Sequence, residues 1–185
     1  VAYLSSASIP SRTANSIHVM QMCSGIAELG KEVVLFAAKK EDSELFNESH
    51  VHNYYGVNEN FQIVRLPWRS FFCGSINYRT RIAWMAKIGD FDLVIGRSLA
   101  ACVIACGLGI PTVYETHAPV KKDSLVERFL LGLLIKMSEF KFSILITEAL
   151  RERFLDDYPE LEERILVLPD GAKPISSTVV PIPLR

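Results

Sequence analysis

His117 is the histidine whose sequence setting best fits a functional site. It directly follows the run Val113-Tyr114-Glu115-Thr116, so we expect it at the end of a buried strand. In parallel sheets this is where loops make ligand contacts. The alternative is a loop histidine that hydrogen-bonds only to backbone. No Ser-His-Asp order and no nucleophile elbow can be assembled around it, so a covalent hydrolase mechanism is not predicted.

Metal-binding chemistry is not predicted from the other histidines and the cysteines. His18, His50 and His52 have no carboxylate or thiol partner at metal-ligand spacing. Cys102 and Cys106 stand four residues apart in an apolar run, as core residues of a helix do. The chain has four cysteines and no CxxC pair, which is typical of a reducing cytoplasm. We therefore expect no metal and no cofactor.

Two glycine patterns resemble phosphate-binding motifs, and both fail on context. Residues 25–31 have P-loop spacing, but Glu32 occupies the position of the Ser or Thr that would hold magnesium. This segment is also the end of a predicted helix rather than its beginning. Gly107 and Gly109 follow a helix and lack the third glycine of a dinucleotide fingerprint.

The composition is that of one globular domain. The chain has 185 residues, of which 49% are hydrophobic and 22% charged, and its net charge is −1. These values exclude a disordered chain, and the lack of a basic excess argues against a nucleic-acid partner. The longest uncharged stretch, residues 98–114, contains Gly107, Gly109 and Pro111, so it does not predict a membrane-spanning helix.

Short apolar runs alternate with segments of helical period along the whole chain. The predicted strands cover residues 1–5, 33–38, 61–67, 92–96, 112–115, 144–147 and 165–168. The first predicted helix has Asn15 or Ser16 as its N-cap and stops at Gly30. The other predicted helices cover residues 44–55, 75–88, 99–107, 124–141 and 148–158. This alternation predicts an α/β fold: a Rossmann-like, doubly wound, mainly parallel sheet with helices on both faces.

Functional side chains of such a sheet lie in the loops that follow its strands. The rule selects residues 5–15, 97–98, 115–122, 147–148 and 170–171. These segments contain most of the polar candidates for ligand contacts: Arg97, Glu115, Lys121, Lys122 and Glu148.

Five segments resemble the N-terminal domain of family 4 glycosyltransferases in their order and spacing. They are PSRTANSIHVM (10–20), LGKEV (29–33), DLVIGR (92–97), YETH (114–117) and ILVLPDGA (165–172). The resemblance implies one half of a GT-B fold, in which two Rossmann-like domains face each other across a cleft. It divides the chain into an acceptor-side domain, residues 1–172, and a linker, residues 173–185, toward an absent donor-binding domain.

The same resemblance implies a retaining transfer of sugar, without metal, from a nucleotide sugar to a glycan or lipid-linked acceptor. His117 matches a histidine that reaches into the cleft, where it would orient sugar hydroxyls or stabilise developing charge. It is the expected catalytic residue. The expected substrate contacts are Arg12, Thr13, Ala14, Asn15, Ser16, Arg97, Glu115, Lys121, Lys122 and Glu148.

The loop before the first helix has a physical reason to bind phosphate. Residues 13–16 begin a helix whose free N–H groups and positive dipole can face the diphosphate of a donor. Family members often have glycines here, and this loop has none. Arg12 is expected either to add a bidentate phosphate contact or to remain a solvated loop residue.

Three alternatives remain open from the sequence. The chain is the acceptor half of one enzyme, or a separate subunit or binding module of a two-polypeptide transferase, or an unrelated nucleotide- or sugar-phosphate-binding Rossmann enzyme. The basic, amphipathic segment 124–141 covers the sheet, or it contacts an anionic membrane surface. The expected location is the cytoplasm. The alternative is a peripheral position at the inner face of the membrane.

Overall fold

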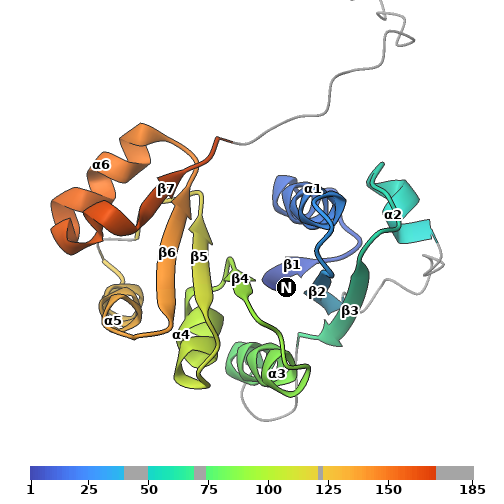
Figure 1. The fold of residues 1–185 in the computed structure, drawn as a ribbon, viewed down its shortest axis with the longest axis horizontal. Coiled ribbons are helices and arrows are strands. Elements are labelled where there is room, and N and C mark those ends of the chain that lie inside the picture. Colours follow the sequence, from blue (N-terminus) through green and yellow to red (C-terminus); the bar gives the residue numbers. More distant parts are fainter. Residues whose placement is uncertain (40–49, 69–73, 121–122, 170–185) are drawn as a thin grey trace, which may run out of the picture.

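The computed structural model describes residues 1–39, 50–68, 74–120 and 123–169, and they form a parallel sheet covered by helices (Figure 1). Seven strands lie in the order β3-β2-β1-β4-β5-β6-β7, and every neighbouring pair is parallel. The strands are β1 (Ala2–Ser8), β2 (Val34–Lys39), β3 (Gln62–Pro67), β4 (Val94–Gly96), β5 (Thr112–Thr116), β6 (Phe140–Leu145) and β7 (Ile165–Val167). This confirms the predicted fold class, and each of the seven predicted strands overlaps a strand of the structure.

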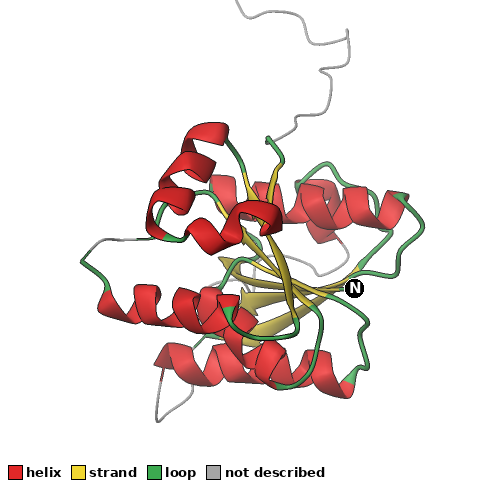
Figure 2. Cartoon of the chain, turned by 60° about the vertical axis from the view of Figure 1, so that its left-hand side comes forward, coloured by secondary structure: helices red, strands yellow, loops and turns green. Residues whose placement is uncertain are grey.

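Helices cover both faces of the sheet, as Figure 2 shows. They are α1 (Ala14–Glu28), α2 (Val51–Tyr54), α3 (Gly74–Ile88), α4 (Leu99–Gly107), α5 (Leu125–Ile135), α6 (Glu148–Asp157) and the 3-10 helix η3 (Pro159–Arg164). In Figure 1, α1 and α2 lie on one face, and α3 and α4 lie on the other. Among the described residues, no helix is long and apolar enough to cross a bilayer.

The interior strand β1 supplies core residues to both faces because its side chains alternate. Tyr3 packs into the cluster that contains Val19 and Met20 of α1. Leu4 packs into the opposite cluster, with Ile82 of α3 and residues of α4. All five of these side chains are fully buried. The packing fixes β1 between two layers, which determines where its C-terminal end emerges.

The strand order changes direction next to β1. From β1 the chain adds β2 and β3 on one side, and then β4 to β7 on the other side. The C-terminal ends of β1 and β4 therefore diverge into loops that lead away from each other. Ligands of open parallel sheets bind at such a switch point.

Several predicted boundaries were wrong. Helix α1 begins at Ala14, since Thr13 and not Asn15 or Ser16 is its N-cap. Strand β1 runs on to Ser8 instead of ending at residue 5. The predicted helix 124–141 ends at Ile135, and β6 begins at Phe140, because Phe140 already pairs with the first residue of β5.

Some predictions fall outside the described residues. They are Lys121 and Lys122, the first half of the helix predicted over residues 44–55, the turn 170–171, and the proposed linker 173–185. Within the described part of 44–55, only Val51–Tyr54 is α-helical.

Arg164 of η3 holds the junction between α5 and β6. Its guanidinium donates to the carbonyls of Ile135 (2.9 Å), Lys141 (3.3 Å) and Phe140, and it lies 4.3 Å from the centre of the Phe140 ring. The last carbonyls of a helix have no partner within it. Arg164, which lies far along the chain, thus supplies hydrogen-bond donors to the carbonyls at the C-terminal end of α5.

Two glycines have clear structural roles. Gly30 has a φ of +76° directly after the end of α1, which confirms the predicted C′ glycine. Gly96 ends β4 where α4 approaches the sheet, and a β-carbon there would lie 2.5 Å from the sulfur of Cys102. Cys23, Cys102 and Cys106 are all buried, as predicted for core residues.

Candidate functional site

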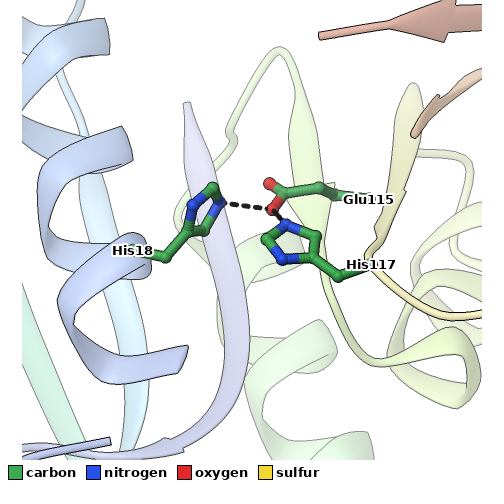
Figure 3. Close-up of side chains that lie close together, drawn as sticks. All are labelled: His18, Glu115 and His117. Carbon is green, nitrogen blue, oxygen red and sulfur yellow. Dashed lines mark hydrogen bonds and ion pairs between the residues drawn. The ribbon is translucent and has the colours of Figure 1, made fainter. Parts of the chain in front are cut away.

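The candidate site is built around Glu115, near the C-terminal end of β5. Its carboxylate is 1% exposed and lies where β1, β5 and α1 meet. The helix α1 brings His18 to one side of it, and the loop after β5 brings His117 to the other (Figure 3). The site thus combines residues from both sides of the switch point.

Three side chains hydrogen-bond to this carboxylate. The Nε2 atoms of His18 and His117 lie 2.6 and 3.1 Å from Oε1. The hydroxyl of Tyr3 donates to Oε2 at 2.6 Å. The two imidazole rings meet edge to face, with centroids 4.5 Å apart. Each oxygen of Glu115 therefore has at least one donor, as a buried carboxylate requires.

The guanidinium of Arg97, in the loop after β4, adds positive charge to the group. Its Nε lies 3.6 Å from Oε1 of Glu115, and its side chain is 14% exposed. Another of its nitrogens, Nη1, is buried and has no hydrogen-bond partner among the described residues. Arg97 therefore faces the carboxylate with one atom and keeps a donor for another partner.

Burial and hydrogen bonding act in opposite directions on the pKa of Glu115. Burial raises the pKa, but hydrogen bonds from His18 and Tyr3 and the positive charge of Arg97 lower it by more, so the net pKa is below its ordinary value. Burial and the nearby carboxylate both raise the pKa of Tyr3 well above its ordinary value. At neutral pH the group therefore contains an ionised glutamate and a neutral tyrosine.

An ionised carboxylate accepts hydrogen bonds and cannot donate them, and this assigns the histidine tautomers. Both His18 and His117 must carry a proton on Nε2 to donate to Glu115. In its neutral form each ring then has its basic lone pair on Nδ1. The side chains of His18 and His117 are 17% and 20% exposed, so both rings reach the surface.

The same three residues are a set of potential metal ligands. The ligand atoms of His18, Glu115 and His117 lie within 4.8 Å of one another. The expectation that His18 lacks a carboxylate partner was wrong, because Glu115 is supplied by another strand. Ligand atoms of a tetrahedral zinc site lie about 3.3 Å apart, farther than the 2.6 Å from His18 to Glu115. Together with the nearby Arg97, this spacing favours a hydrogen-bonded network.

The N-terminus of α1 lies beside this group, since His18 is in the second turn of the helix. Thr13 caps the helix by accepting a hydrogen bond from Ser16 N at 3.2 Å. The Ser16 side chain is fully buried and donates to the carbonyls of Ser11 and Thr13. Ser16 is thus part of the loop's own structure, whereas Ala14 and Asn15 are exposed, with N–H groups that have no acceptor inside the helix.

The remaining predicted contacts are more scattered. Arg12 is exposed in the loop before α1. Glu148 opens α6 after the neighbouring strand β6, where its side chain is 70% exposed and lies 3.8 Å from Arg151. Glu115 was predicted to touch substrate, but the structure places it beneath His117 rather than at the surface.

Sequence reasoning missed His18 and Tyr3. They lie 97 and 112 residues from Glu115, so no local spacing reveals the contacts. The one usable signal is the strand order: once β1 and β5 flank β4, side chains on the same face of β1 and β5 lie near one another.

The sheet and its switch-point site define the chain as a Rossmann-like domain that forms one half of a GT-B fold. Residues 16–174 match the model of Glycosyltransferase Family 4, and the chain belongs to this family. Among curated protein sequences, no significant match to this chain is found.

Solved structures support the fold. HepE from Anabaena, in complex with UDP and glucose, superposes with a TM-score of 0.63 at 13% identity. UGT89C1 from Arabidopsis thaliana, complexed with UDP, superposes with a TM-score of 0.60 at 12% identity. The matches cover 92% and 93% of this chain but only 44% and 49% of those proteins. The chain thus spans less than half the length of either structure.

Proposed function

We propose that this chain is the acceptor-binding half of a retaining glycosyltransferase, which transfers a sugar from a nucleotide sugar to a glycan or lipid-linked acceptor. The observation that carries the proposal is the Glu115 group at the switch point, in a chain that belongs to a glycosyltransferase family. The UDP complexes of HepE and UGT89C1 support a nucleotide-sugar donor. A donor-binding half completes the active site.

In the proposed reaction the bond from the anomeric carbon to the leaving phosphate breaks while a bond to the acceptor oxygen forms on the same face. The proton of the acceptor hydroxyl passes to the leaving phosphate oxygen. His117 orients a sugar hydroxyl through its imidazole ring, which Glu115 holds at Nε2. The N-terminus of α1, at Ala14 and Asn15, offers N–H groups to the diphosphate. No step requires a metal.

Glu115 acts through His117 in this proposal. It is too buried to reach a substrate, but it fixes the tautomer and direction of the imidazole. His18 and Arg97 hold the carboxylate from two other directions. Glu115 is therefore a positioning residue, and His117 is the catalytic residue.

Substitution of His117 tests the proposal in the enzyme that carries both halves. We expect His117→Ala to lower turnover about a hundredfold or more in a chain that still folds, because an oriented donor or acceptor of this kind contributes on this scale. The measurement is sugar transfer from a panel of nucleotide sugars, with circular dichroism as the check of folding.

His50→Ala is the matched control, since His50 is exposed and makes no capping hydrogen bond at the start of α2. It should retain full turnover. Near-normal turnover of His117→Ala would remove His117 from the site. Absence of sugar transfer by the unaltered two-domain enzyme across the panel would remove the proposed function itself.

The exposed surface of α5 favours an additional function, which is contact with a membrane. Leu125, Val126 and Phe129 are 78%, 68% and 69% exposed, while Leu131 and Leu134 of the same helix are fully buried. The helix thus packs on the core and also presents apolar groups outward, beside the exposed Arg128. We propose that this outer face contacts an anionic membrane surface on which a lipid-linked acceptor resides.

A further inference from the structure

A cavity beside the Glu115 group is not explained by the role proposed for His117. It has a volume of about 430 Å³ and lies at the switch point, between the ends of β1, β4 and β5. Ser6, Arg97, Ser98 and Thr116 line it from these strands and the loops after them, and Arg79 lines it from α3. The cavity is large enough for one sugar-sized group.

Both arginines of the cavity have buried donors without acceptors. Nε of Arg79 and Nη1 of Arg97 are buried and have no hydrogen-bond partner within the described part of the chain. They are two of only three such side-chain atoms there, and the third, in Ser143, does not line the cavity. Buried guanidinium nitrogens are normally paired, so two unpaired ones in arginines that line one cavity favour a bound acceptor at these side chains.

The start of α4 adds further donors to the same cavity. Ser98 is the N-cap of this nine-residue helix, and its side chain makes no capping hydrogen bond. Ser98, Leu99 and Ala100 all line the cavity. The first N–H groups of α4 have no acceptor within the helix, and the helix dipole is positive there. This arrangement suits a ligand with more acceptor oxygens than a carboxylate has.

Two carboxylates face the arginines and limit their net charge. Glu115 lies 3.6 Å from Arg97, and Glu127 of α5 lines the cavity. Arg97 is therefore partly neutralised, whereas Arg79 has no ion pair with any described residue. Substitution of Arg79 therefore tests anion binding in the cavity more selectively than substitution of Arg97.

We propose that this cavity binds the phosphate monoester of a phosphorylated acceptor, through Arg79, Arg97 and the N-terminus of α4. That the phosphate belongs to the acceptor, and not to the donor, rests on the proposed function. In that proposal the donor diphosphate binds on the other side of the Glu115 group, at the N-terminus of α1. The bound phosphate would set the acceptor hydroxyl at a fixed distance from His117, which follows Thr116 of the cavity wall.

Titration of the chain with inorganic phosphate tests the subsite without any sugar transfer. We expect saturable shifts of the Arg79 and Arg97 Nε–H signals in 15N NMR spectra. Arg79→Gln should weaken phosphate binding by at least about tenfold, and Arg79→Lys should restore part of it. Glu127→Gln should strengthen binding, an effect that a purely structural role of these residues does not predict. Arg128→Gln, an exposed arginine of α5 outside the cavity, is the control and should bind normally.

Two further titrations identify whether the phosphate belongs to a soluble sugar or to a lipid. Glucose 6-phosphate and a short-chain phosphatidic acid present the same monoester on a soluble sugar and on a lipid. Tighter binding of either one than of inorganic phosphate supports the proposal and names the acceptor type. Unchanged phosphate affinity in Arg79→Gln, or displacement of phosphate from Arg79 by UDP, would overturn the acceptor subsite. Phosphate binding without sugar transfer by the two-domain enzyme would overturn only the proposed function.

Discussion

At the scale of single residues, one buried carboxylate determines the geometry of the candidate site. Glu115 receives hydrogen bonds from His18, His117 and Tyr3, and it lies next to Arg97. Removal of one member of a buried charged group leaves the others without partners, which costs more than the hydrogen bond itself contributes. The site residues are therefore also stability residues.

Glu115→Gln tests this double role. We expect the free energy of unfolding at neutral pH to fall by about 1–3 kcal/mol, because the amide donates where the carboxylate accepted. Folding lowers the pKa of Glu115, so the unfolded chain binds more protons below the ordinary value near 4.5. The stability supplied by Glu115 is thus complete above that pH and is lost as the pH falls further.

Urea denaturation at neutral and acidic pH measures both effects. The variant should show a smaller loss of stability on acidification than the unaltered chain. Glu127→Gln, which removes a half-buried carboxylate of α5 outside the Glu115 group, is the comparison. An equal loss on acidification in Glu115→Gln and the unaltered chain would contradict the lowered pKa.

The sequence predicted part of this site. Glu115 and His117 were found because they lie at the end of a run of strand residues and directly after it, which is a local signal. Tyr3 and His18 were missed because their link to Glu115 is made by the strand order and spans about half of the chain. Local sequence patterns predict which residues lie at the end of a strand. Prediction of their partners from other elements requires knowledge of the tertiary arrangement.

At the scale of elements, strands were easier to predict than helix ends. Buried parallel strands are continuous apolar runs, so their existence is clear from sequence. Helix ends depend on competing caps: Thr13, Asn15 and Ser16 are all good N-caps, and the choice was made by the Ser11–Thr13–Ser16 hydroxyl network. Likewise α5 ends earlier than predicted because Phe140 pairs with β5, and Arg164, far away in the sequence, binds the carbonyls of this junction.

The outer face of α5 gives a prediction at this scale. The double variant Leu125→Ser, Phe129→Ser should reduce binding to vesicles that contain phosphatidylglycerol by at least about tenfold, because two exposed apolar anchors are removed. Co-sedimentation with vesicles measures the bound fraction. The helix should remain folded, since its buried residues are unchanged.

Leu29→Ser is the matched control, because Leu29 is 79% exposed at the end of α1, a helix on another face of the sheet. It should bind vesicles like the unaltered chain. If the unaltered chain binds vesicles equally well with and without anionic lipid, the proposed contact of α5 with an anionic surface is wrong.

At the scale of the whole molecule, the chain has one wall of the expected cleft. The structures solved with UDP are more than twice as long as the part that this chain matches. A single wall offers helix N-termini and a few side chains, which is consistent with the net charge of −1. Most of the donor affinity therefore belongs to the second half in our proposal.

Isothermal titration with UDP tests this division. We expect the chain alone to bind UDP at least about a hundredfold more weakly, or about 2.7 kcal/mol, than a polypeptide that contains both halves. Equal affinities would contradict a separate donor half. If the reading frame stops after Arg185, addition of the separate second subunit should restore the affinity instead, which identifies a two-polypeptide enzyme.

The position of β1 in the interior of the sheet has a consequence for the order in which the domain assembles. Synthesis proceeds from β1 outward, so both neighbours of β1 exist once Gly96 has emerged from the ribosome. The junction of α5 and β6 waits for Arg164, which is translated almost last among the described residues. The switch-point half of the domain is thus complete while the β7 edge is still being made.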